Sequence, residues 1–338
     1  MLSTQKILLS ITIIIFFFSC NNENINTEIG KTPIVTTDTT LSHLNEKLKS
    51  NPNNPDLYHE RAKYFLEKKD IDAAMADMAR VLKLDSSKSD YFTTLADLYF
   101  TQGMGGSVKK ALEKSISLEP ANTAAIIKLA ELHLYLKNYK ECLGNLDNAL
   151  KIDKYNAKIY FLKGMVFKET RDTAKAVSSF QTTVEQDTDY YDAYMQLGLL
   201  YSIRHSKLAM DYFRSAIKIN PKNIEAYYGL AMFAQENGAY ENAIEVYNSI
   251  LQIDSTYQFA HYNLGYINSE YLKNYKNAIT NFSNAIKNDT TYFEAYYMRG
   301  LCYERMKDFK NAEVQYQLSL KIKPDWTLAA EGMSRIKG

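Results

Sequence analysis

An excess of charge of one sign is missing from this chain: Lys and Arg number 40 against 39 Asp and Glu, and the formal net charge is +1. Balanced charge gives no reason to expect nucleic acid or an anionic lipid surface as the main partner. Proline and glycine are also scarce, at six and 13 residues, whereas Tyr numbers 27 and apolar residues make up 46%. The composition favours a helical, tyrosine-rich protein with ample material for a core.

Catalytic and metal-binding motifs are absent as well. There is no Gly-x-Ser-x-Gly and no Cys-x-x-Cys, and Lys63 stands where a zinc-protease helix beginning at His59 would need its second His. Cys142 and Cys302 lie 160 residues apart, which in a solenoid is too far for a disulfide. The sequence therefore predicts a protein that is not an enzyme, with no catalytic residue, no metal site, no cofactor and no small-molecule substrate.

The N-terminal segment differs from the rest of the chain. Residues 7–18 form an apolar run after Lys6. Twelve helical residues span roughly 18 Å, less than the ~30 Å hydrocarbon core, so a secretory signal is favoured over a membrane span. The sequence Phe17-Phe18-Ser19-Cys20 resembles a bacterial lipoprotein cleavage box, although Leu and a small residue are commoner before Ser19. The alternative is an uncleaved anchor with an incidental Cys.

That resemblance implies residues 1–19 as a signal peptide and Cys20 as the lipidated N-terminus. Residues 20–39 are rich in Asn and Thr and show no helical periodicity, which is typical of a flexible tether. The implied location is the bacterial cell envelope, with the protein lipid-anchored to the outer membrane on its periplasmic or surface face.

The remainder of the chain repeats. A small residue returns at intervals of 33 to 35 residues, and a second small residue follows most of these 11 to 13 positions later. A period in this range indicates a stacked array of helix pairs. Because two helices approach closely only where side chains are small, these residues should mark the contact within each pair. The first set is Ala62, Ala96, Ala130, Gly164, Gly198, Ala231, Gly265 and Gly300.

These units resemble the tetratricopeptide repeat. The segments AYMQLGLLYS (193–202) and AMDYFRSAIKINP (209–221) are similar to its aromatic-x-x-Leu-Gly-x-x-Tyr and Ala-x-x-x-Phe pattern, and Pro120, Pro221 and Pro324 occupy its closing position. The resemblance implies an all-α, right-handed α-solenoid of about eight helix-turn-helix units over residues 55–326. Half-repeats at 40–53 and 327–338 should cap its ends.

Two units depart from the common length. The fifth is one residue short around residues 203–207, and the seventh is one residue long around 268–271. We expect looser packing near residues 203–207 and 266–272, and faster amide hydrogen exchange there than in the third and fourth units.

In the resembled family the first helices line a concave groove. With Pro55 as position 1, positions 5 and 9 of units four to eight are all apolar or aromatic and should form a stripe facing solvent, with Glu236 and Glu270 nearby. The alternative is that the superhelix packs tightly enough for its own neighbouring units to bury this stripe. The predicted groove residues are Phe161, Met165, Met195, Leu199, Tyr228, Met232, Tyr262, Tyr266, Tyr297 and Leu301.

The sequence thus predicts a lipid-anchored scaffold or adaptor that binds a protein or peptide in its groove, in the assembly of the cell envelope. Tyr and Met suit adaptable recognition surfaces. The alternative of a different class is a surface glycan-binding lipoprotein, because tyrosine faces also stack on sugar rings.

Overall fold

The computed structural model describes residues 39–338, which form eighteen α-helices and, within that range, no strand. The predicted all-α solenoid is confirmed. The signal peptide, Cys20 and nearly all of the predicted tether lie outside the described residues. The helices are α1 (Thr39–Ser50), α2 (Pro55–Glu67), α3 (Ile71–Leu84), α4 (Ser89–Thr101), α5 (Gly105–Leu118), α6 (Thr123–Tyr135), α7 (Tyr139–Ile152), α8 (Ala157–Glu169), α9 (Thr173–Gln186), α10 (Tyr191–Ile203), α11 (Leu208–Ile219), α12 (Ile224–Glu236), α13 (Tyr240–Ile253), α14 (Gln258–Glu270), α15 (Tyr275–Asn288), α16 (Phe293–Arg305), α17 (Phe309–Ile322) and α18 (Thr327–Lys337).

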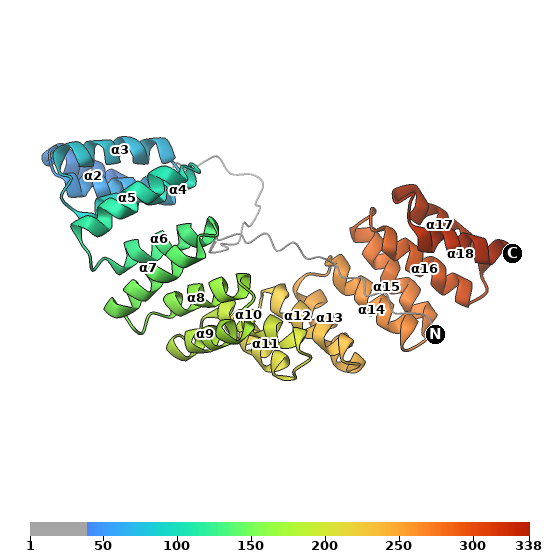
Figure 1. The fold of residues 1–338 in the computed structure, drawn as a ribbon. Helices are drawn as coiled ribbons and strands as arrows, with labels where there is room; N and C mark the ends of the chain where they lie inside the picture. The colour runs from blue at the N-terminus through green and yellow to red at the C-terminus, as the bar shows by residue number, and fades with distance from the viewer. Residues whose placement is uncertain (1–38) are drawn as a thin grey trace.

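The helices from α2 to α17 are arranged as eight antiparallel pairs, one for each repeat unit, and α1 and α18 stand alone at the two ends. Figure 1 shows the pairs following one another in an open arc. In the middle of this arc the first helices α8, α10 and α12 lie on the inner side, and α9 and α11 lie on the outer side. We call the surface that the first helices present on this side the inner face.

The turn inside each pair requires one residue in the left-handed backbone region. Gly103 and Gly238 meet that requirement in units two and six, with φ of 70° and 77°. The other six turns place a side-chain-bearing residue there, which costs roughly 1–2 kcal/mol each relative to glycine. These residues are Lys69, Lys137, Arg171, His205, Lys273 and Lys307. The turn is therefore dictated by the packing of the pair and not by local preference.

The recurring small residue does mark the closest approach within a pair. A Cβ atom built on Gly164 would lie 2.6 Å from the ring of Phe180, which the second helix of the same unit directs at it. Ala130 occupies the same position in unit three, where the second helix presents Leu146 instead, and both are buried. Glycine thus accompanies an aromatic ring and alanine an aliphatic side chain. Unit six is the exception, with Ala231 in the cluster of Tyr247.

The two units of unusual length differ in opposite ways: unit five has a second helix of 12 residues, α11, where α9 has 14, and unit seven has its extra residue in the turn between α14 and α15. In unit five, Ile203 is 75% exposed at the end of α10. In unit seven, Asn268 is buried, and its side-chain amide donates a hydrogen bond to the carbonyl of Leu264 at 2.8 Å. The faster hydrogen exchange expected at these two places stays a prediction.

Candidate functional site: the inner face of the first helices

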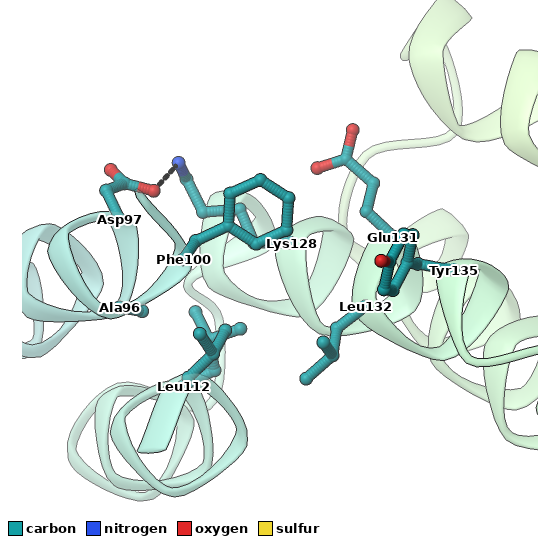
Figure 2. A pocket seen from close by; sticks show the side chains of 9 residues that line it. Ala96, Asp97, Phe100, Leu112, Lys128, Glu131, Leu132 and Tyr135 are labelled. Carbon is teal, nitrogen blue, oxygen red and sulfur yellow. Dashed lines mark hydrogen bonds and ion pairs between the residues drawn. The ribbon is translucent and has the colours of Figure 1, made fainter. Parts of the chain in front are cut away.

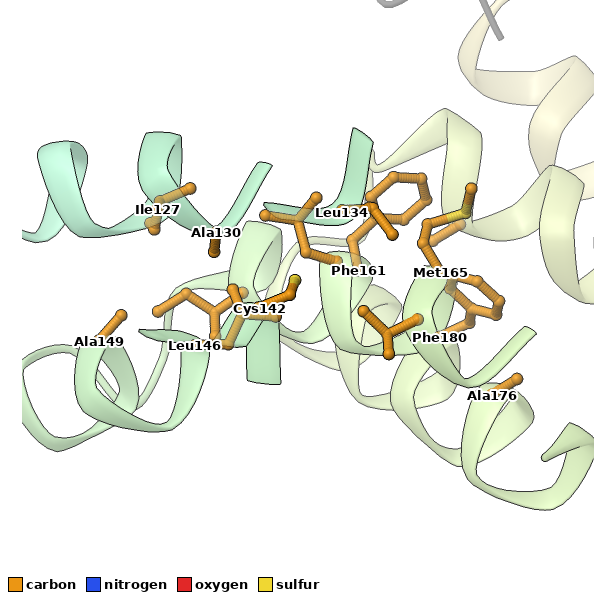
Figure 3. Close-up of a cluster of buried hydrophobic side chains, with 14 of the residues drawn as sticks. Ile127, Ala130, Leu134, Cys142, Leu146, Ala149, Phe161, Met165, Ala176 and Phe180 are labelled. Atoms are coloured by element: carbon orange, nitrogen blue, oxygen red, sulfur yellow. The ribbon is translucent and has the colours of Figure 1, made fainter. Parts of the chain in front are cut away.

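The predicted groove residues do not face open solvent. Phe161, Met165 and Met195 are buried, with 8%, 4% and 5% exposure, and the other seven are half-buried. Figure 3 shows Phe161 and Met165 inside a buried cluster together with Phe180. The expectation of a solvent-facing stripe is therefore wrong for these three positions, which the self-covering alternative describes, whereas the other seven keep part of their surface exposed.

Aromatic rings from the following unit cover this stripe. The residue that precedes a first helix packs its ring on position 5 of the unit before it, in four of the units. The sequence carried this signal, since an aromatic residue recurs just ahead of several first helices. The pairs, with the distance between ring centroids, are Phe161–Tyr190 at 5.0 Å, Tyr228–Tyr257 at 6.0 Å, Tyr262–Tyr292 at 4.9 Å and Tyr297–Trp326 at 6.4 Å.

In units six to eight these contacts join into one aromatic cluster. Phe259 links its two halves, with ring centroids 5.5 Å from Tyr257 and 5.9 Å from Tyr292. Phe259 is 37% exposed, whereas the other members are half-buried. The rings thus present one edge or face to solvent while their remaining surface is packed. The members of the aromatic cluster are Tyr228, Tyr257, Phe259, Tyr262 and Tyr292.

The two predicted groove glutamates have different surroundings. Glu236 is exposed at the end of α12. Glu270 is half-buried, and its Oε1 accepts a hydrogen bond from Arg305 Nη1 at 2.5 Å. Burial acts to raise the pKa of Glu270, but the hydrogen bonds and charge of Arg305 outweigh it and leave the pKa below its usual value. The negative charge of Glu270 is therefore already balanced by Arg305 inside the protein.

Three further carboxylates, which were not among the predicted groove residues, have no arginine or lysine partner. Asp192, Glu225 and Glu294 each stand at the second residue of a first helix, in α10, α12 and α16. Asp192 and Glu225 are exposed and Glu294 is half-buried. Partial desolvation by the surrounding residues raises the pKa of all three, and the charge of Asp192 raises that of Glu225 further. No ion pair is formed by these three side chains in the described part of the chain.

A well-formed pocket lies on the inner face between units two and three. Its volume is about 230 Å³, and its floor is apolar, built from Ala96, Val108, Leu112 and Leu132. Figure 2 shows Leu112 of α5 below the opening, with Phe100 and Tyr135 beside it. Phe100 is 50% exposed and Tyr135 72%. Phe100 and Tyr135 stand three and four positions after position 9 of their units, outside the stripe of positions 5 and 9 that predicted a groove in units four to eight.

Charged side chains at the rim of this pocket are paired with one another. Lys128 Nζ lies 2.5 Å from Asp97 Oδ1, and Lys158 Nζ lies 2.8 Å from Glu131 Oε1. The pocket thus combines a neutral rim with an apolar floor and two exposed rings. This combination suits an apolar side chain presented by another molecule better than an ion.

Reactive groups are shielded in the described residues. Cys142 and Cys302 are free and buried, as predicted, and burial raises the pKa of the Cys142 thiol to about 12. Burial also lowers the pKa of His59 to about 4, and its Nε2 lies 2.7 Å from Thr94 Oγ1. Residues 39–338 contain no group of three or more His, Cys, Asp or Glu placed to hold a metal ion. Among helices α1 to α18 none is long and apolar enough to cross a membrane.

Family models match most of the chain. The model of the FAT domain matches residues 36–208, about half of the chain, and two models of the tetratricopeptide repeat match residues 207–264 and 293–325. The helix pairs have the same architecture before and after residue 208.

Curated relatives are tetratricopeptide-repeat proteins of greater length. Tetratricopeptide repeat protein 6 of Homo sapiens is 23% identical over 292 residues, which cover 84% of this chain and 56% of the relative. Tetratricopeptide repeat protein 13 of Homo sapiens is 23% identical over 214 residues, covering 59% of this chain and 25% of the relative. The chain thus spans about half or less of these relatives.

Solved structures share the fold. A tetratricopeptide repeat protein from Parabacteroides merdae has a TM-score of 0.50 at 16% identity, covering 75% of this chain and 100% of that one. PilF of Pseudomonas aeruginosa has a TM-score of 0.53 at 14% identity, covering 60% of this chain and 92% of that one. By the model that matches about half of it, the chain belongs to the FAT-domain family, and models of the tetratricopeptide repeat match residues 207–264 and 293–325 of the remainder.

Proposed function

We propose that the protein is a non-catalytic scaffold that holds an extended segment of a protein partner along the inner face of its first helices. The single observation that carries this proposal is the pocket between units two and three. Its two flanking rings are exposed, whereas Asp97, Lys128 and Glu131 at its rim are each held in an ion pair. Exposed aromatic residues beside an apolar pocket are a common form of binding hot spot.

A display library of random peptides tests this proposal directly. Selection on the intact protein should enrich peptides that share an apolar anchor residue. Phe100→Ala and Tyr135→Ala should each weaken the selected peptides roughly tenfold, as expected for loss of an aromatic hot-spot residue. Tyr155→Ala is the matched control, because Tyr155 is 65% exposed but does not line the pocket. Equal weakening by all three changes, or none by the first two, would reject the pocket as the docking site.

We further propose that the scaffold is anchored to the cell envelope by a lipid on Cys20. The support is the apolar run at residues 7–18 followed by Ser19-Cys20. Labelling of cells with an alkyne fatty acid should mark the wild-type protein and leave the Cys20→Ser variant unmarked and released from membranes. A variant that stays fully membrane-bound and labelled would rule out this anchor.

Glycan binding is a second candidate, favoured by the partly exposed rings of the aromatic cluster. A sugar ring could stack on Phe259, its most exposed member. Soluble cell-wall and capsule oligosaccharides that raise the melting temperature of wild type but not of Phe259→Leu would support it. If none of these sugars raises the melting temperature, glycan binding is rejected and only the peptide proposal remains.

A further inference from the structure

The second position of the first helix carries a carboxylate in units one, two, five, six and eight, and in unit one this carboxylate has a cation. Lys88 Nζ lies 2.6 Å from Asp56 Oδ1, and the hydroxyl of Tyr91 donates to the same oxygen at 2.6 Å. The same ammonium lies 5.5 Å from the centroid of the Tyr91 ring. The hydrogen bonds from Lys88 and Tyr91 lower the pKa of Asp56. Unit one therefore contains an ammonium held between a carboxylate and an aromatic ring.

In units five, six and eight the residue equivalent to Lys88 is not a cation. Lys88 directly precedes helix α4, and the residues that directly precede the equivalent helices α12, α14 and α18 are Asn223, Tyr257 and Trp326. The carboxylates of these units are Asp192, Glu225 and Glu294, and none of them forms an ion pair in the described residues. An amide or an aromatic ring thus stands where unit one has Lys88, and the same holds for Asp90 of unit two, where Asn122 precedes the next first helix.

Two of these carboxylates border the aromatic cluster. Glu225 lies one helical turn before Tyr228 in α12, and the ring centroid of Tyr228 is 6.0 Å from that of Tyr257. Glu294 lies one helical turn before Tyr297 in α16, and the ring centroid of Tyr297 is 6.4 Å from that of Trp326. The charge of Lys323 acts to lower the pKa of Glu294, but the Lys323 ammonium itself lies 3.5 Å from Asp325. Rings and carboxylates thus lie side by side in units six to eight without an internal cation between them.

We propose that the partner segment is basic, an inference that rests on the proposed function. Its lysine or arginine side chains occupy, in units five, six and eight, the place that Lys88 fills in unit one. Each basic group would meet Asp192, Glu225 or Glu294, and in units six to eight the rings of Tyr257, Phe259 or Trp326 would lie beside it. An ammonium or guanidinium gains from both neighbours, since a carboxylate supplies an ion pair and an aromatic face attracts a cation.

A purely structural role for these carboxylates makes a different prediction. An acid in the first turn of a helix interacts favourably with the helix dipole. If that were their role, neutralising them would lower stability. A carboxylate whose pKa is raised by burial instead costs stability while it is charged, so its neutral isostere should leave the melting temperature unchanged or higher.

The test uses the full chain and fluorescence anisotropy with synthetic extended peptides of one design. The first peptide alternates lysine with leucine and glycine, the second carries acetyl-lysine at every lysine, and the third carries glutamate there. The variant combines Asp192→Asn, Glu225→Gln and Glu294→Gln. Its matched control combines Glu185→Gln, Glu241→Gln and Glu245→Gln, which remove the same charge from exposed positions on the second helices α9 and α13.

We expect wild type to bind the lysine peptide roughly tenfold or more tightly than the acetyl-lysine peptide, with an advantage that shrinks as salt rises. The inner-face variant should lose that advantage without a lower melting temperature, and the control should keep it. Phe259→Leu should weaken the lysine peptide without affecting the acetylated one. These results together would support the inference.

Several outcomes would overturn it. Equal binding of the lysine and acetyl-lysine peptides, or equal loss in the two triple variants, would remove the specific role of these carboxylates. Competition by spermine at the affinity of the peptide would assign the surface to a free polyamine. If neutral peptides bind and lysine gives no advantage, this inference alone fails. If no peptide of any charge binds, the proposed function fails with it.

Discussion

The contact between Gly164 and Phe180 allows a quantitative test of why the small residue recurs. Gly164 lies inside α8, and a Cβ there would be 2.6 Å from the Phe180 ring. In unit three the equivalent contact is formed by Ala130 and Leu146. We therefore predict that Gly164→Ala is destabilising by itself and becomes stabilising when Phe180→Leu accompanies it.

The magnitude follows from two opposing terms. Overpacking a well-packed contact costs about 1–3 kcal/mol, and replacing glycine by alanine inside a helix gains about 1 kcal/mol. The single variant should thus lose up to about 2 kcal/mol of unfolding free energy. With leucine at residue 180 the overpacking term vanishes and the gain of about 1 kcal/mol remains. The coupling energy between the two substitutions equals the overpacking term and should therefore be about 1–3 kcal/mol.

Urea denaturation of the four proteins of this cycle measures the coupling, with native-state hydrogen exchange to localise it to units three to five. Gly144→Ala is the control, because Gly144 lies inside α7 with no atom near its missing Cβ, and it should simply gain about 1 kcal/mol. A coupling energy within about 0.5 kcal/mol of zero would refute the contact explanation. Loss of stability in the control would refute the helix-propensity term.

Three further outcomes follow from buried polar groups. Asp77 accepts two hydrogen bonds from Arg61 at 2.7 Å, so Asp77→Asn should cost about 1–3 kcal/mol in urea denaturation. In unit eight Arg299 and Gln315 are equivalent to Arg61 and Asp77, and Arg299 donates there to the amide oxygen of Gln315. Gln315→Glu should therefore raise the free energy of unfolding by about 1 kcal/mol, and a decrease would contradict this pairing. Burial lowers the pKa of His59 in the folded chain to about 4, below the usual 6.5. As pH falls, the unfolded chain therefore binds a proton at His59 before the folded chain does. Stability should be full above pH 6.5 and decline towards pH 4, and His59→Gln should flatten that decline if His59 causes it.

The candidate site was predictable only in part. Tyr228 and Tyr262, which the sequence placed at the same position of successive units, belong to one aromatic cluster through the rings between them. Their exposure was not predictable, because it depends on which residue of the next unit packs on them. The pocket beside Phe100 and Tyr135 was missed for the same reason: a cavity is set by three helices from two units, and no single stretch of sequence contains them.

By itself the sequence determined the period, the helix pairs and the close contact at each small residue, because these depend on spacings of three and four residues within one unit and on the size of one side chain. Only the tertiary structure decided which charges remain available. Asp56 and Glu225 occupy equivalent positions, yet the next unit gives Asp56 the ammonium of Lys88 and places the ring of Tyr257 beside Glu225. The physical reason is that a charge is neutralised by whatever lies within hydrogen-bonding distance, and here that neighbour comes from more than thirty residues further along the chain.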